Sequence, residues 1–222
     1  MAEPSTPSRR IEVAPDRLAG WIESFGRRHG GSLTGQYSPD AVTFTAADGA
    51  IARCAVPFPP LADGSAGEPL SLAARVAGHA QADRIVGVLL VRLGGYAAGV
   101  FTGPGPVLAA SKVGSRLVHG RSAAGGQSQL RFARRREKQA REALDEAADK
   151  AAAVFRPFRL DAFVLGGDRR TMAGLRHDNR LAPYFPVAVE RFLTVPDPKL
   201  TVLRDTPRLF RAIRITLTEP AA

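Results

Sequence analysis

The segment of residues 85–91 most strongly restricts how this chain can fold. It reads Ile-Val-Gly-Val-Leu-Leu-Val, so apolar residues follow one another with one glycine and no charge. A strand that alternates apolar and polar residues needs cover on one face only, whereas an uninterrupted apolar strand needs cover on both. We therefore expect a sheet with helices on both faces and this strand at its centre.

Further strands and one long helix are predicted after this segment. Residues 96–101 predict the next strand and residues 107–118 one or two further strand pieces, and apolar residues at helical spacing predict a helix over 128–155, which Pro157 ends. Beyond it we expect a strand at 161–165, a helix near Gly167-Asp168, a strand near 191–195, a helix from Pro207 and a strand at 214–218. This order predicts an α/β fold with a mixed β-sheet flanked by helices.

The first 69 residues have a different pattern. Residues 1–10 are rich in Pro, Ser and Thr, lack the apolar core of a secretion signal and predict a disordered N-terminus. Residues 11–69 predict a small α+β subdomain with a helix over 15–28 and a hairpin whose second strand is 51–56. Its Pro- and Gly-rich end at 57–69 marks a boundary. We assign residues 70–222 to a larger domain, which begins with a helix near 70–77.

Composition narrows the class of partner. The chain has 31 Lys and Arg against 21 Asp and Glu, a net charge of +10, which favours a polyanion such as nucleic acid or an acidic membrane. The uncharged residues 93–111 contain five Gly and two Pro, so they cannot form a membrane-spanning helix. The single cysteine, Cys54, excludes a disulfide within the chain and a Cys-based metal site. We expect a cytoplasmic protein with no membrane partner.

The loop before the long helix carries the strongest chemical signal. Gly125 and Gly126 let the backbone approach a ligand closely, and Gln127 then presents an amide. Because this amide does not titrate, it can orient water or donate to an oxyanion but cannot act as a general base. Positioning of this kind suits an activated ester. Alternatively, the segment is a glycine-rich loop in which Ser128 caps the helix.

The first half of the predicted helix is strongly basic. Against one acid, Glu137, it has six basic residues: Arg131, Arg134, Arg135, Arg136, Lys138 and Arg141. Positive charge at a helix start opposes the helix dipole, so a bound phosphate backbone would explain this order. Alternatively, the run is a solvated face with Glu137–Arg141 and Arg141–Asp145 pairs.

These two features together resemble a known family. Gly125-Gly126-Gln127-Ser128, followed by residues 130–134 and Arg136, is similar to the catalytic loop of eukaryotic and archaeal class-1 release factors. In a chain of this size, it resembles more particularly the Vms-type release-factor-like peptidyl-tRNA hydrolases, including their actinobacterial members. The resemblance implies a ribonuclease-H-like release-factor catalytic domain. Its implied activity is hydrolysis of the ester that joins a nascent peptide to tRNA in stalled ribosomal complexes.

The resemblance also implies residue roles and partners. Gln127 would position the water, Gly125 and Gly126 would let the loop enter, and Arg131, Arg134 and Arg136 would contact RNA. Arg135 and Lys138 belong to the same basic run, and from its charge we expect them to bind RNA as well. The expected partners are the large ribosomal subunit, its RNA and peptidyl-tRNA. Because no counterpart of a codon-reading domain is found, ribosome rescue is expected rather than stop-codon reading. The alternatives are a noncatalytic ribosome- or RNA-binding protein and a tRNA-cleaving nuclease.

Two other features of the sequence are weaker indications of a binding site. The four histidines have no metal-ligand spacing, so neither a metal nor another cofactor is expected. The segment Gly166-Gly167-Asp168, between a predicted strand and helix, can either cradle a phosphate or form a tight turn in which Asp168 caps the helix.

Overall fold

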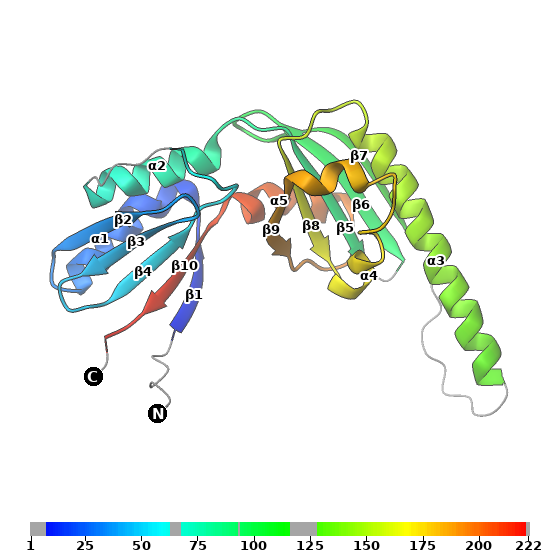
Figure 1. Cartoon of the computed structure of the whole chain (residues 1–222), viewed down its shortest axis with the longest axis horizontal. Helices are drawn as coiled ribbons and strands as arrows, with labels where there is room; N and C mark the ends of the chain where they lie inside the picture. Colours follow the sequence, from blue (N-terminus) through cyan, green and yellow to red (C-terminus); the bar gives the residue numbers. More distant parts are fainter. Residues whose placement is uncertain (1–7, 63–67, 93, 116–127, 221–222) are drawn as a thin grey trace. The chain divides into compact units, whose positions relative to one another are not determined.

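A computed structural model describes residues 8–62, 68–92, 94–115 and 128–220, with the side chains of all of these except residues 128–136. Contacts divide the chain into two compact units (Figure 1). Unit 1 contains residues 1–82 and 210–222, and unit 2 contains residues 83–209.

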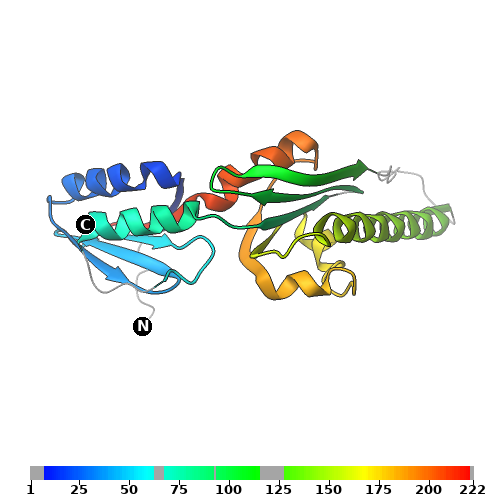
Figure 2. The same cartoon turned by 90° about the horizontal axis from the view of Figure 1, so that it is seen from above.

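Unit 1 is an antiparallel sheet covered by two helices. Its elements are β1 (Ser8–Val13), the 3-10 turn η1 (Pro15–Arg17), α1 (Leu18–Arg28), β2 (Leu33–Tyr37), β3 (Ala41–Ala46), β4 (Ile51–Ala55), α2 (Pro69–Gln81) and β10 (Ile213–Thr218). The strand order is β1-β10-β4-β3-β2. Figure 2 shows α1 and α2 on the same face of this sheet.

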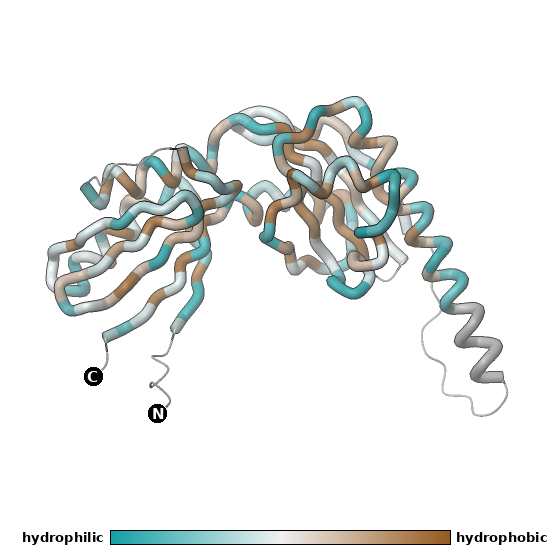
Figure 3. The backbone as a smooth tube through the Cα atoms, in the orientation of Figure 1, coloured by the Kyte–Doolittle hydropathy of each residue, from teal (hydrophilic) through white to brown (hydrophobic). Residues whose placement is uncertain are grey.

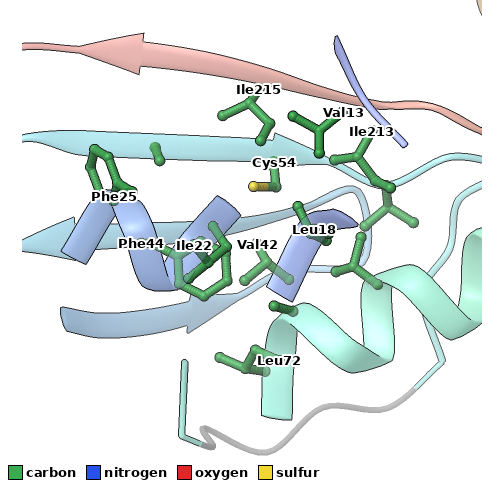
Figure 4. Packing of buried hydrophobic residues seen from close by; sticks show 14 of the residues in the cluster. Val13, Leu18, Ile22, Phe25, Val42, Phe44, Cys54, Leu72, Ile213 and Ile215 are labelled. Carbon is green, nitrogen blue, oxygen red and sulfur yellow. The ribbon is translucent and has the colours of Figure 1, made fainter. Parts of the chain in front are cut away.

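The core of unit 1 lies between those helices and the sheet (Figure 4). Leu18, Ile22 and Phe25 recur at helical spacing along α1, and all three are buried. They face strand residues that include Phe44 and Cys54. Burial of Cys54 raises the pKa of its thiol to about 12, so this side chain is a packing residue rather than a nucleophile.

Unit 2 is built on the mixed sheet that the sequence predicts. Its elements are β5 (Val86–Arg92), β6 (Gly95–Thr102), β7 (Val107–Ser115), α3 (Ser128–Phe155), β8 (Ala162–Gly167), α4 (Arg169–Ala173), η2 (Ala182–Val187), β9 (Ala188–Leu193) and α5 (Leu200–Arg211), the last of which ends in unit 1. The strand order is β7-β6-β5-β8-β9. Strand β6 is antiparallel to both of its neighbours, β7 and β5, whereas β5, β8 and β9 are parallel.

Helices cover both faces of the unit 2 sheet, as the apolar run of β5 requires. Figure 2 shows α3 and α5 on opposite faces. Leu203 of α5 packs on Gly99 of β6, where a Cβ atom would lie only 2.9 Å from the leucine side chain. In Figure 3 the strands of the unit 2 sheet are coloured mainly as hydrophobic. The confirmed features are the mixed sheet, the central position of β5 and the bounds of α3.

The two units are divided differently from the predicted domains 11–69 and 70–222. Helix α2 belongs to unit 1 because its buried face, which includes Leu72 and Val76, joins the core of that unit. The closing strand β10 also belongs there, between β1 and β4. Strand β1 begins at Ser8, so residues 8–10 of the predicted disordered N-terminus are ordered, while residues 1–7 lie outside the described residues.

Two other predictions differ from the structure. Strand β2 has no counterpart in the sequence prediction, because Gly35 and Gln36 interrupt its apolar pattern. Helix α5 begins at Leu200, so Pro207 lies inside it rather than at its start. A proline removes the N–H that would bond the carbonyl four residues back, that of Leu203. The hydroxyl of Thr206 donates to this carbonyl instead, at 2.7 Å, which lets the helix continue.

Candidate functional site

The predicted catalytic loop connects the last strand of the antiparallel part of the sheet to α3. Strand β7 ends at Ser115 and α3 begins at Ser128, so residues 116–127 make this connection. Gly125, Gly126 and Gln127 fall within it and lie outside the described residues. Their catalytic role stays a prediction, and the structure defines the two elements that hold the ends of the loop.

Alanine residues line the face of α3 that packs on the sheet. The buried ones are Ala143, Ala147, Ala148, Ala151 and Ala152. Such small side chains let the helix lie close to the sheet, chiefly against β6. At the end of α3, Phe155 is fully buried, and its ring centroid lies 5.4 Å from that of Phe163 and 5.2 Å from that of Tyr184. The second half of α3 is therefore anchored in unit 2.

The part of α3 before Ala143 leaves this packed interface. Glu137, Lys138, Ala140 and Arg141 are exposed, and Figure 1 shows the start of the helix extending beyond the sheet. The predicted RNA-binding arginines belong to this part by their backbone: Arg131, Arg134, Arg135 and Arg136. Their side chains lie outside the described residues, so their contacts with RNA stay a prediction.

Two basic side chains of this part of α3 are described. The Nζ atom of Lys138 lies 3.9 Å from Glu142 Oε1, and Arg141 Nη2 lies 3.5 Å from Glu137 Oε1. Both basic side chains are about four-fifths exposed. Exposed pairs of this kind contribute only about 0.3–0.5 kcal/mol on a helix. The expected Glu137–Arg141 pair is thus present, and it is weak enough for an RNA phosphate to displace the carboxylate.

The acidic half of α3 is tied to the segment that follows α4. One guanidinium nitrogen of Arg180 donates to Asp145 and to Asp178, at 2.7 Å in each case. These hydrogen bonds, first that with Asp178, raise the pKa of Arg180 above its usual value. The bond from Arg180 lowers the pKa of Asp178. Asp145 is therefore engaged by Arg180, which connects α3 to the rest of unit 2.

The net positive charge of the chain belongs to one unit. Residues 83–209 contain 22 Lys and Arg against 12 Asp and Glu, whereas residues 1–82 and 210–222 contain nine of each. Unit 2 therefore carries a charge of +10 and unit 1 none, with histidines neutral. Attraction to a polyanion such as RNA is accordingly expected from the unit that holds the loop and α3.

Within the described residues, two cavities open at the edge of the unit 2 sheet where its parallel strands end. In open α/β sheets, ligands bind beyond these carboxyl ends. The smaller cavity, about 240 Å³, is mainly apolar and lies between α3, α4 and the end of β5; it is lined by Val91, Gly94, Gly95, Ala140, Ala143, Leu144, Arg170 and Thr171. The larger one, about 470 Å³, is lined by Arg92, Gly95, Val113, Gly114, Ser115, Asp197, Pro198, Lys199 and Leu200.

Sequence patterns do not single out the residues of the larger cavity. Arg92 is the charged residue that ends the apolar run of β5, and Lys199 follows Pro198 directly before α5. A charge at the carboxyl end of a buried strand is the available signal. The two residues are distant in the sequence, so local patterns do not indicate that they share a cavity.

The turn after β8 is a helix cap. Gly167 has φ +100°, and a Cβ atom there would lie 2.2 Å from the carbonyl oxygen of Val91. The carboxylate of Asp168 accepts from the backbone N–H of Thr171 at 2.8 Å and from its hydroxyl. These bonds, first that of the hydroxyl, lower the pKa of Asp168. The predicted cap is confirmed, and α4, which spans only Arg169–Ala173, offers little helix dipole to a phosphate.

The described part of the chain contains neither a cluster of candidate metal ligands nor a helix that could span a membrane. No group of three or more His, Cys, Asp or Glu residues within it is placed to hold a metal ion. The carboxylate of Asp161, for example, accepts from the backbone N–H of Ile85 at 2.8 Å. None of the helices in the described ranges is both long enough and apolar enough to cross a membrane.

The chain is similar to a known protein family and to solved structures of archaeal proteins. A family model described as Actinobacteria/chloroflexi VLRF1 release factor matches residues 84–216. No curated protein matches the sequence. Similar solved structures include the archaeal translation termination factor aRF1, with 12% identity over 91% of this chain and a TM-score of 0.43, and Pelota from Archaeoglobus fulgidus, with 11% identity over 95% and a TM-score of 0.33. The chain spans 64% and 66% of these two proteins, less than two thirds of either.

Proposed function

The chain belongs to the Actinobacteria/chloroflexi VLRF1 release factor family, and we propose that it is a peptidyl-tRNA hydrolase that frees nascent peptides from stalled ribosomal complexes. The match over residues 84–216 carries this proposal, because it includes both the Gly-Gly-Gln segment and α3. The proposal places the protein in the cytoplasm on the large ribosomal subunit. The mixed sheet of unit 2 supports the proposal of a ribonuclease-H-like fold.

In the proposed reaction, water attacks the carbonyl carbon of the ester between the peptide and the tRNA ribose. The bond from this carbon to the ribose oxygen breaks, so the peptide leaves with a free carboxylate and the tRNA regains its hydroxyl. The amide of Gln127 orients the water, and Gly125 and Gly126 allow the backbone to approach the ester. Because glutamine does not titrate, its contribution is positioning rather than proton transfer.

The basic start of α3 provides affinity for RNA in this proposal. Arg131, Arg134, Arg135, Arg136 and Lys138 contact phosphates of ribosomal or transfer RNA. Two observations support this role: the net charge is confined to unit 2, and the exposed pair of Lys138 with Glu142 is weak. The contact of Phe155 with Phe163 anchors the end of α3 in unit 2, so the helix keeps its position when its basic start binds RNA.

The test uses ribosome-bound peptidyl-tRNA labelled on both the peptide and the tRNA. The parent is expected to free the peptide and leave a tRNA with an intact 3′ end. Gln127→Ala should lose release while binding the ribosome like the parent. Gln36→Ala, which changes an exposed glutamine of unit 1, is the matched control and should release normally.

Three other outcomes would contradict a part or the whole of this proposal. Equal release by the parent and by Gln127→Ala would remove the catalytic role of the amide. A shortened tRNA would indicate nuclease chemistry. Ribosome binding without release would favour a noncatalytic binding protein.

A further inference from the structure

The larger cavity of unit 2 has the size and lining of a ligand site. Its volume of about 470 Å³ lies within the range of roughly 300–1,000 Å³ that is usual for small-molecule sites. The end of β5, the start of β6, the end of β7 and the start of α5 all contribute to it. A cavity where four separate segments meet at the carboxyl edge of a sheet is a typical place for a ligand.

Among the described residues, two cations line this cavity, Arg92 and Lys199. The guanidinium of Arg92 is held in place, because its Nη1 donates to the carbonyl oxygen of Val195 at 3.1 Å and its Nε lies 3.6 Å from Asp197 Oδ1. Lys199 is exposed, and within the described ranges its ammonium has no ion-pair partner. Ser115 also lines the cavity, and its hydroxyl is able to donate a hydrogen bond.

One carboxylate competes for Arg92. The side chain of Asp197 is 75% exposed, so its attraction to Arg92 is weakened by solvent. An anion with two negative charges attracts Arg92 and Lys199 together and can replace Asp197 beside the guanidinium. The first turn of α5 also borders the cavity, and a helix start carries partial positive charge.

We propose that this cavity binds the phosphate ester of a nucleotide, with Arg92 and Lys199 as its charged contacts. A phosphate ester fits because it offers several acceptor oxygens to a guanidinium, an ammonium and a hydroxyl at once. Free nucleotides and RNA strands share this chemistry. The inference goes beyond the proposed release reaction and does not rest on it, since none of the cavity residues belongs to the Gly-Gly-Gln segment.

The test titrates the full chain with adenosine 5′-monophosphate, with the 5′-phosphorylated ribotrinucleotide CCA and with adenosine, by calorimetry. The parent should bind both phosphate esters and bind adenosine much more weakly. Lys199→Ala should weaken binding of both esters about tenfold, as expected when a charge-assisted hydrogen bond is removed. Asp197→Asn, which removes the competing carboxylate, should tighten it.

Lys112→Ala is the matched control, because Lys112 is an exposed lysine of β7 that does not line the cavity. It should bind like the parent. In NMR spectra of the parent, the amide signals of Gly95 and Gly114 should shift on addition of the mononucleotide. The two esters identify the source: tighter binding of the trinucleotide indicates RNA, and equal binding indicates a free nucleotide.

Three results would overturn the proposal. They are no binding of either ester at millimolar concentration, adenosine binding as tightly as its monophosphate, and equal weakening by Lys199→Ala and Lys112→Ala. Failure here is distinguishable from failure of the release activity. Gln127→Ala should bind the mononucleotide normally, and mononucleotide binding is measured without ribosomes.

Discussion

The ring of Phe155, the last residue of α3, meets the ring of Phe163 in β8 edge to face, with centroids 5.4 Å apart. The ring of Tyr184 also packs on Phe155, with centroids 5.2 Å apart. This aromatic cluster fixes the end of the helix that is distant from the Gly-Gly-Gln segment. Because α3 extends without interruption from Ser128, the cluster also fixes the direction in which the start of the helix leaves the sheet.

Replacing Phe155 by alanine is expected to destabilise unit 2 by about 3–5 kcal/mol, the usual cost of removing a buried phenylalanine. Phe155→Leu should cost less, because it keeps most of the apolar volume and loses mainly the aromatic contacts, worth about 0.5–1.5 kcal/mol each. Urea unfolding followed by circular dichroism measures both. An alanine variant that unfolds at the midpoint of the parent would contradict the anchoring role.

Gly167→Ala is expected to be severely destabilising. Its φ of +100° disfavours any side chain, and the new Cβ would lie 2.2 Å from the carbonyl oxygen of Val91. Gly49→Ala is the matched control, since Gly49 has φ +88° but open space around it. The control should cost only the backbone strain, about 1–3 kcal/mol, and Gly167→Ala clearly more. Thermal unfolding of the two variants compares them, and equal costs would show that the clash with Val91 is relieved easily.

Elements with strong local periodicity were predictable from the sequence. The apolar spacing from Ser128 to Phe155 indicated the bounds of α3, and the unbroken apolar run placed β5 at the centre of its sheet. The helix cap at Asp168 was also predictable from the sequence, because Asp is one of the residues that commonly cap a helix at its start. In each case the information lies within a few residues of the feature.

Features that depend on distant partners were not predictable in this way. The alternation of β10 predicts a strand, but nothing local indicates that Ile215 pairs with Cys54 and Ile11 rather than with a strand of unit 2. The proposed nucleotide cavity also depends on distant residues, since Arg92 and Lys199 line one cavity only after the sheet has formed. Local pattern identifies elements, and sheet membership follows from long-range packing.

Ile215→Ala tests the place of β10 in unit 1. This side chain is fully buried, so its truncation should cost about 2–5 kcal/mol. Hydrogen exchange followed by mass spectrometry should then show faster exchange in peptides from residues 8–62 and 68–82. Thr216→Ala, a change at the half-buried neighbour, should leave exchange close to that of the parent. Faster exchange confined to residues 83–209 would contradict the assignment of β10.

The basic start of α3 is tested by salt dependence. Arg131→Ala combined with Arg134→Ala should weaken ribosome binding and flatten the logarithmic salt slope by about 0.7–0.9 for each phosphate that the variant no longer neutralises. Arg27→Ala combined with Arg28→Ala is the control, because these arginines lie on α1 in the neutral unit. Filter binding at several salt concentrations measures the slopes. Unchanged slopes in both double variants would mean that Arg131 and Arg134 lie on a solvated face and do not contact RNA phosphates.

The cap of α4 should make stability depend on pH in the acidic range. Hydrogen bonds from Thr171 hold the pKa of Asp168 below its usual value, so the folded protein keeps this carboxylate ionised at lower pH than the unfolded chain does. Its stabilisation is therefore complete above the pKa of the unfolded chain, about 3.9, and is lost as the pH falls through the lower folded value. Asp168→Ala should cost about 1 kcal/mol at neutral pH. The difference from the parent should narrow below pH 4, as urea unfolding at pH 7, 4 and 3 can show. A difference that stays constant over this range would mean that the charge of Asp168 contributes nothing to the cap.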